Sequence, residues 1–145
     1  MRLRIEYLPT YDMSWGGLQK AHPSDAGFDV RTVENLAIPP HCGVIAHLGF
    51  KTEFDEGYEA QLRARSGLAS RYGIGLVNGV GTIDAHYRGE WAVLLYNHGP
   101  DIICLQRGER IAQVVFNQLP QVDIEYGEVN TSDRGAGGFG STGNE

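Results

Sequence analysis

Residues 90–97 have the sequence EWAVLLYN, in which apolar side chains fill the central positions one after another. The run has the length of a β-strand and is shorter than a typical helix, and Gly89 and Gly99 lie just outside it. Successive side chains of a strand point to opposite faces, so this strand is apolar on both faces. Residues 90–97 therefore predict a strand that is covered on both sides, either inside a β-sandwich or at a contact between subunits.

Several other segments of strand length surround this one, and few segments have a helical period. Leu3, Ile5 and Tyr7 alternate with charged residues, which predicts an N-terminal strand. The other predicted strands are 44–50 continued to 54, 58–65, 102–105, 110–119 and 122–126. Glycine, proline, asparagine and aspartate separate them at short intervals, which favours an all-β sandwich or barrel. One short helix is predicted over 66–72, with Ser66 as its N-cap.

Composition narrows the class of protein. The length of 145 residues fits one domain, and the sequence has no apolar run long enough to span a membrane. The net charge of −6 argues against a protein that binds nucleic acid through bulk positive charge. Cys42 and Cys104 form no CxxC pair, and the N-terminal sequence MRLRIEYLPT lacks the apolar core of a signal peptide. We therefore expect a cytoplasmic protein without disulfides.

The last stretch, 130–145, has the sequence NTSDRGAGGFGSTGNE and differs in composition from the rest. Its only large apolar residue is Phe139, so the stretch cannot form a core of its own. We expect a single β-barrel domain over 1–129 and a flexible glycine-rich arm over 130–145. Composition alone leaves two roles open for the arm: a flexible tail, or a segment in which Arg134, Phe139 and free amides close over a bound nucleotide.

Common site motifs are absent from the sequence. Residues 138–143 match GxGxxG in letters, but a dinucleotide fingerprint opens a helix inside a βαβ unit, and no such unit is predicted here. No Gly-Lys-Ser/Thr follows a glycine-rich loop, and the five histidines show no paired ligand spacing. A GxSxG elbow is also missing. These absences argue against a P-loop enzyme, a zinc enzyme and a serine hydrolase.

Three segments retain chemistry suited to a nucleotide. Residues 65–69, RSGLA, place an arginine and a serine at the start of the predicted helix, where an anion is favoured, although an ordinary helix start has the same residues. Residues 78–90 contain a glycine-flanked turn followed by Asp84, which suits a carboxylate that orients water and equally suits a solvated turn. Residues 108–113, GERIAQ, add an arginine and an amide, or simply a surface arginine and an edge glutamine.

The order of these segments along the chain resembles the five ordered motifs of the trimeric dUTPases, the deoxyuridine triphosphate nucleotidohydrolases. The five segments are AGFDV (26–30), RSGLA (65–69), GTIDAHYRGE (81–90), GERIAQ (108–113) and RGAGGFGSTG (134–143). The resemblance covers nearly the whole chain, and its third and fifth motifs are long and specific. It implies an all-β, jelly-roll-like β-barrel with one short helix and a flexible C-terminal arm.

The resemblance also implies an activity and an assembly. The implied reaction is hydrolysis of dUTP to dUMP and pyrophosphate, which keeps uracil out of DNA and supplies dUMP. The implied assembly is a homotrimer that shares its active sites between subunits, with dUTP as ligand and with neither nucleic acid nor membrane as partner. Mg²⁺ is the implied cofactor, held mainly by phosphate oxygens and water, as this ion prefers.

Residue roles follow from the motif positions. Asp84 matches the aspartate that activates the water attacking the α-phosphorus, and Tyr87 matches the tyrosine under the deoxyribose, whose ring leaves no space for a 2′-hydroxyl. The positions that match the uracil-binding part are Asn78, Gly81, Thr82 and Ile83. Those that match phosphate-binding groups outside the arm are Arg65, Ser66, Gly67 and Gln113. Asp29 matches an aspartate associated with the metal–phosphate region through water.

The arm supplies the remaining substrate-binding positions. Arg134 is expected to clamp the γ-phosphate, and Phe139 to stack on uracil. The other matched positions in the arm are Gly140, Ser141 and Thr142, of which the last two are expected to hold phosphates. Two alternative functions remain: a dCTP deaminase of the same fold, and a regulatory protein whose contacts depend on nucleotide.

Overall fold

The computed structural model describes residues 1–138 and leaves residues 139–145 outside the described part. The elements in chain order are β1 (Leu3–Tyr7), the 3₁₀ turn η1 (Met13–Trp15), β2 (Phe28–Arg31), β3 (Leu36–Ile38), β4 (Gly43–His47), β5 (Phe50–Phe54), β6 (Tyr58–Ala64), α1 (Ser66–Tyr72), β7 (Ile74–Leu76), β8 (Gly81–Asp84), β9 (Ala92–Asn97), β10 (Ile103–Leu105) and β11 (Arg110–Gln118). No helix in residues 1–138 is long and apolar enough to cross a membrane.

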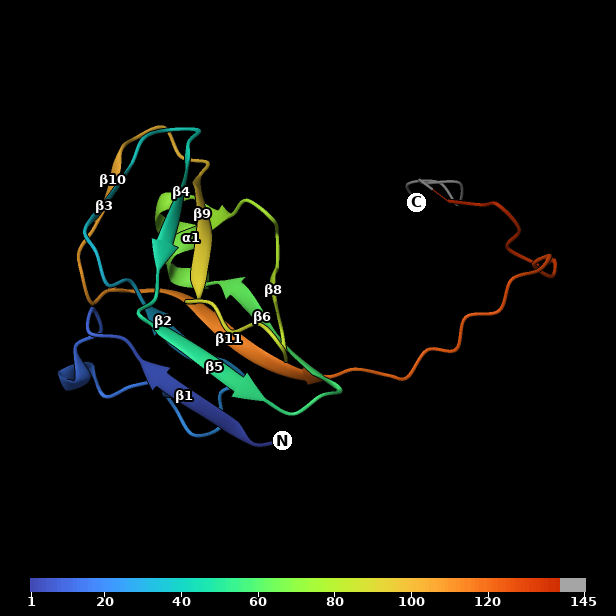
Figure 1. Ribbon diagram of the computed structural model, residues 1–145. Helices are drawn as coiled ribbons and strands as arrows, with labels where there is room; N and C mark the ends of the chain where they lie inside the picture. The colour runs from blue at the N-terminus through green and yellow to red at the C-terminus, as the bar shows by residue number, and fades with distance from the viewer. Residues whose placement is uncertain (139–145) are drawn as a thin grey trace.

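The strands form four antiparallel sheets that surround one core (Figure 1). Their strand orders are β1–β5, β10–β3, β2–β11–β6–β8 and β4–β9–β7. The all-β class with one short α-helix is therefore confirmed. Within the described residues the strands do not close into one continuous hydrogen-bonded barrel, because each sheet ends at an unpaired edge.

The apolar run over residues 90–97 contributes several side chains to the core. Trp91 is fully buried and its ring lies 5.1 Å from that of Phe50, and Val93 and Leu95 of β9 are also buried. The opposite face of β9 is different. Leu94 stays 37% exposed, and Ile45, its register partner on β4, is 57% exposed. Within one chain β9 is thus covered on one face only, and the other face presents apolar side chains to the surroundings.

The predicted strand over 44–54 is two strands that belong to different sheets. Gly49 has φ 72°, in the left-handed region that favours glycine, and the chain turns there between β4 and β5. The amide of Leu48 donates to the carbonyl of Trp91 at 2.9 Å, which attaches the turn to the core. The alternation of apolar residues continues through the turn, and this continuity is why the sequence pattern alone does not show the break.

Helix α1 has the predicted bounds, but its N-cap is Arg65 rather than Ser66. Arg65 has extended backbone angles and makes no side-chain cap hydrogen bond. Ser66 is the first helical residue, so its hydroxyl is not engaged in capping. The helix ends at Gly73, whose amide donates to the carbonyls of Leu68 and Ala69 from a left-handed conformation.

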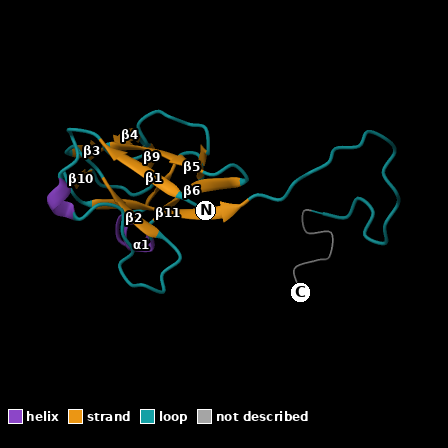
Figure 2. Cartoon of the chain, turned by 60° about the horizontal axis from the view of Figure 1, so that its bottom comes forward, coloured by secondary structure: helices purple, strands orange, loops and turns teal. Residues whose placement is uncertain are grey.

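The chain leaves the body after β11. The amide of Leu119 still donates to the carbonyl of Gly57 at 2.7 Å. The chain beyond it, up to residue 138, extends away from the sheets in both views (Figures 1 and 2). Val122 and Ile124 are more than 70% exposed and Tyr126 is 96% exposed. The strand predicted over 122–126 is absent from the isolated chain, because a strand needs a neighbouring strand to bond its backbone and none of the strands described within 1–138 pairs with this segment.

Candidate functional site

The end of β6 and the start of α1 form one wall of a hollow of about 360 Å³, here called the phosphate hollow. Its lining includes residues from the loop before β2, from β2 itself, from α1 and from β11: Gly27, Asp29, Arg65, Ser66, Gly67 and Gln113. The predicted residues Asp29, Arg65, Ser66, Gly67 and Gln113 are therefore brought together. They come from three segments that lie far apart in the sequence.

Asp29 holds two arginines at the rim of the phosphate hollow. One carboxylate oxygen lies 3.0 Å from Nε of Arg65, and the other lies 2.9 Å from Nη1 of Arg110. The Asp29 side chain is only 16% exposed, so these ion pairs are partly shielded from water. A guanidinium held in this way has fewer rotamers to lose when it binds an anion. Asp29 thus acts first as a positioning group for Arg65 and Arg110.

Gln113 and Gly27 form the opposite wall. Gln113 lies directly opposite Asp29 in the register of β11 and β2, and its Nε2 donates to the carbonyl of Ala64 at 3.0 Å. A Cβ at residue 27 would collide with the Gln113 carboxamide oxygen, so glycine is required there for close approach. The hydrogen bond to Ala64 holds the Gln113 side chain at the wall of the hollow.

The second group of predicted residues lies around β8. Gly81, Thr82, Ile83 and Asp84 make up the strand, Asn78 precedes it and Tyr87 follows it. The turn over 77–80 is tight, since the amide of Val80 donates to the carbonyl of Asn78 at 2.8 Å. The glycines around Val80 would suit a hairpin between the flanking strands, but β7 pairs with β9 and β8 pairs with β6. The turn therefore joins two sheets, and its exposed residues Asn78 and Val80 project from the molecule.

Asp84 is exposed at the end of β8 and lies opposite Glu59 of β6. Two carboxylates at directly paired positions repel each other. The Glu59 carboxylate accepts a hydrogen bond from Nε2 of Gln61 at 2.6 Å, which holds it on its own strand. Asp84 has no hydrogen-bond donor to its side chain among residues 1–138, so its carboxylate is available to bind water.

Tyr87 is held in the turn after Asp84. Its amide donates to the Asp84 carbonyl at 3.0 Å, and its hydroxyl donates to the Glu90 carbonyl at 3.1 Å. A Cβ at residue 89 would collide with the Tyr87 ring and hydroxyl, so Gly89 makes this ring position possible. Asp84 and Tyr87 therefore form one compact unit with a fixed ring orientation.

The two groups are far apart within one chain. Asp84 pairs with Glu59 at the beginning of β6, whereas Arg65 follows the end of β6, six residues later. At a rise of about 3.3 Å per residue, the two backbone positions are roughly 20 Å apart. The phosphate hollow and the Asp84–Tyr87 unit are therefore two separate groups within one chain.

The arm residues are separate from both groups. Arg134 belongs to the segment that extends from the body, and its Nε donates to the carbonyl of Gly137 at 2.9 Å. Phe139, Gly140, Ser141 and Thr142 lie outside the described residues. Arg110 is not among the predicted site residues, and the structure places it against Asp29. The signal that could have found it is its position in GERIAQ, three residues before Gln113.

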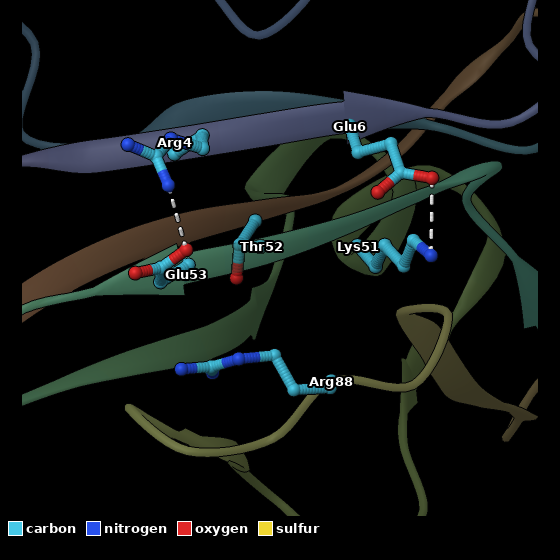
Figure 3. Close-up of a pocket in the computed structure, with 6 residues that line it drawn as sticks. All are labelled: Arg4, Glu6, Lys51, Thr52, Glu53 and Arg88. Carbon is cyan, nitrogen blue, oxygen red and sulfur yellow. Dashed lines mark hydrogen bonds and ion pairs between the residues drawn. The ribbon is translucent and has the colours of Figure 1, made fainter.

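Another hollow, of about 140 Å³, lies over the β1–β5 ribbon (Figure 3). Most of its charges are already paired: Arg4 lies 3.0 Å from Glu53, and Lys51 lies 3.0 Å from Glu6. Exposed pairs of this kind contribute little to stability and leave little net charge for a ligand. The ribbon hollow is therefore a weaker candidate for an anion site than the phosphate hollow.

Comparison with protein families finds a match between residues 14–143 and the dUTPase family. The chain is 46% identical over 119 residues to the deoxyuridine 5′-triphosphate nucleotidohydrolase of Nautilia profundicola, covering 81% of this chain and 84% of that protein. It is 48% identical over 123 residues to the protein of the same name from Rhizobium rhizogenes, covering 81% of this chain and 79% of that one.

Solved structures with the same fold come from bacteriophages. The Staphylococcus bacteriophage 80alpha dUTPase with dUPNHPP superposes with a TM-score of 0.85, at 24% identity and over 98% of both chains. A mutant dUTPase from phage phi11 of S. aureus, described with a structural Mg(II) ion, superposes with a TM-score of 0.79 at 19% identity, over 91% of this chain and 100% of that one. At these identities the likeness supports the fold.

Proposed function

Because the chain belongs to the dUTPase family, we propose that it hydrolyses dUTP to dUMP and pyrophosphate. The observation that carries the proposal is the pair of preformed groups: a hollow whose lining includes Arg65, Ser66 and Gln113, and an exposed aspartate beside a fixed tyrosine ring. The family match and the names of the relatives favour this function over the deaminase alternative.

In the proposed reaction the phosphate hollow binds the triphosphate. Arg65 and Arg110 neutralise negative charge, and Ser66 and Gln113 offer hydrogen bonds from the walls. Asp84 holds a water in line with the α-phosphorus and accepts its proton as the oxygen attacks, and pyrophosphate leaves on the opposite side. Phosphoryl-type displacement depends mainly on placement and charge neutralisation, which these fixed side chains provide.

The turn around residues 78–83 is proposed to select the base. A backbone N–H facing O4 of uracil would meet the amino group of cytosine donor to donor. Leaving such a buried pair unmatched costs about 1–3 kcal/mol, enough to make dCTP a poor substrate. A thymine methyl group would need volume that a tight turn does not leave. Tyr87 supports the choice of sugar, since its ring would occupy the space of a 2′-hydroxyl.

We further propose a homotrimer in which each site combines residues of different subunits. The separation of Arg65 from Asp84 along β6 supports this, because one chain does not bring both to one nucleotide. The exposed apolar pair Ile45 and Leu94 gives an unpartnered surface for a subunit contact. The segment around Tyr126 exposes apolar residues far from its own body, as expected for a segment that lies on a neighbour.

The arm and the metal complete the proposal. We propose that residues 1–129 are the domain and that residues 130–145 are an arm that closes over a site. Mg²⁺ bound with the triphosphate would neutralise phosphate charge, held mainly by phosphate oxygens and water. Both oxygens of Asp29 already face arginines, so its contact with the ion would run through water. The cytoplasmic location stays a prediction.

A nucleotide panel tests the proposed function. Purified protein is incubated with Mg²⁺ and with dUTP, dCTP or dTTP separately, and the products are identified by chromatography. We expect dUMP and pyrophosphate from dUTP alone. Conversion of dCTP to dUTP or dUMP would replace the proposal with the deaminase alternative. No turnover by the folded protein would instead support a regulatory role, which a dUTP-dependent partner in a pull-down would identify.

Gly89→Ala is expected to weaken discrimination between dUTP and UTP. The new Cβ displaces the Tyr87 ring, which opens space for a 2′-hydroxyl. We expect the ratio of kcat/KM for dUTP to that for UTP to fall by about tenfold, the scale of a small steric difference in a pocket. Tyr87→Phe is the control, because it keeps the ring and loses only the hydrogen bond to Glu90. Equal ratios in Gly89→Ala and the unmodified protein would remove Tyr87 from sugar selection.

A further inference from the structure

Arginine side chains are concentrated in a second hollow that adjoins the phosphate hollow. This arginine hollow has a volume of about 420 Å³ and is lined chiefly by Trp15, Arg31, Arg65, Arg107, Glu109 and Arg110. Arg65 lines both hollows, so the two hollows are adjacent and share one guanidinium group. None of the five motifs assigns a role to Trp15 or Arg107.

The arginine hollow has an excess of positive charge. Four of its lining residues are arginines, and Glu109 is the only carboxylate among its lining residues within 1–138. Asp29 lies behind the hollow and is shared by Arg65 and Arg110. Counting the lining and Asp29 together, four arginines therefore stand against two carboxylates. The ribbon hollow of Figure 3 differs, because Arg4 and Lys51 each have an acidic partner there.

Arg31 and Arg110 occupy an electrostatically unfavourable position. They are direct partners in the register of β2 and β11, where two like charges destabilise the pair. Asp29 compensates Arg110, whereas Arg31 has no carboxylate partner among residues 1–138. Within residues 1–138 its side chain makes one hydrogen bond, from Nη1 to the carbonyl of Gly108 at 2.6 Å. The remaining N–H groups of Arg31 are therefore available to an anion, which would also relieve the repulsion.

The loop over 11–20 covers one side of the hollow. The guanidinium carbon of Arg107 lies 4.8 Å above the Trp15 ring, and Arg107 donates to the carbonyls of Thr10 and Val33. Trp15 also packs closely on Gly108, where a Cβ would approach its ring to 3.0 Å. Arg107 thus has a structural function. Arg31 is the side chain that remains free for a ligand.

One further negative charge lies nearby. Hydrogen bonds from the hydroxyl and the amide of Ser14 lower the pKa of Asp12, with a smaller contribution from Arg107. Asp12 is therefore ionised at neutral pH. It faces the structural Arg107 and is absent from the lining, so the surplus charge near Arg31 remains.

We propose that the arginine hollow is a second anion site that binds inorganic pyrophosphate as it leaves the phosphate hollow. The role as a product site depends on the proposed function, because hydrolysis of dUTP is the source of pyrophosphate. Arg31 is the principal ligand-binding residue, and Arg65, which lines both hollows, connects them. A diphosphate carries enough charge and enough acceptor oxygens to bridge several guanidinium groups.

Isothermal titration with inorganic pyrophosphate at fixed Mg²⁺ tests the site without any turnover. Arg31→Gln should weaken pyrophosphate binding by about tenfold, the scale of one lost charge-assisted hydrogen bond. Binding of the substrate analogue dUPNHPP should change by less than about twofold. Arg31→Lys, which keeps the charge, should retain most of the pyrophosphate affinity, and Arg4→Gln, from the ribbon hollow, should retain all of it. Equal losses for pyrophosphate and dUPNHPP would place Arg31 in the substrate site and overturn the proposal.

A second variant acts in the opposite direction and does not depend on Arg31→Gln folding. Glu109→Gln removes the one carboxylate of the lining while keeping an acceptor for the amide of Gln106. It should strengthen pyrophosphate binding by about threefold or more, because a repulsive charge near the anion is lost. Unchanged or weaker binding would contradict the site. If dUTP is not hydrolysed while Arg31 still controls pyrophosphate affinity, the proposed function fails and the anion site stands.

Discussion

Asp84→Asn is expected to lower kcat for dUTP by about 10³-fold, within the range for removal of a general base. The amide keeps the size of the side chain and its place at the end of β8, so the water is still accommodated. What is lost is the charge that orients this water and accepts its proton. The measurement is single-turnover release of dUMP at saturating dUTP.

Binding separates this account from a general disturbance of the site. Affinity for dUPNHPP should stay the same or rise slightly, because the neutral amide of the variant would no longer repel the anionic triphosphate. The free energy of unfolding of the Asp84→Asn variant should not fall either, since the repulsion between Asp84 and Glu59 is removed. Glu59→Gln is the matched control: it removes the opposite carboxylate and should leave turnover nearly unchanged. An equal loss in both variants would take the role of base away from Asp84 alone.

Much of the fold is predictable from local pattern. The alternation of Leu3, Ile5 and Tyr7 and the run over 110–119 correspond to β1 and β11, since side-chain period and strand length are local properties. The break at Gly49 is not predictable in the same way. Glycine tolerates a left-handed conformation but does not require it, and the turn forms because the Leu48 amide pairs with Trp91, far along the chain.

The candidate site, like the fold, is predictable from the sequence only in part. The motifs assign Arg65, Ser66 and Gln113 to substrate binding, and the structure places all three in the lining of one hollow. The partners of Asp29 are not predictable from spacing, because the pairing with Arg110 depends on the register between β2 and β11. Strand 122–126 fails as a prediction for an isolated chain, because its alternating pattern requires a neighbouring strand that residues 1–138 do not supply.

Mixed trimers should recover activity that neither parent variant has. Asp84→Asn chains keep Arg65, and Arg65→Gln chains keep Asp84. In a ring where each site takes Arg65 from one subunit and Asp84 from the next, random assembly of equal amounts leaves both intact at about one quarter of the sites. We therefore expect roughly one quarter of the normal turnover after the two variants are unfolded together and refolded.

The controls decide whether subunits have exchanged. The two variants refolded separately and then mixed should remain inactive, and native mass spectrometry should find both chain types within single trimers of the co-refolded sample. Turnover of the co-refolded sample is the measurement that tests the shared site most directly. Recovery to about one quarter of normal is the predicted result. Verified mixed trimers that stay as inactive as their parents would contradict it, and would require Arg65 and Asp84 to act from the same chain.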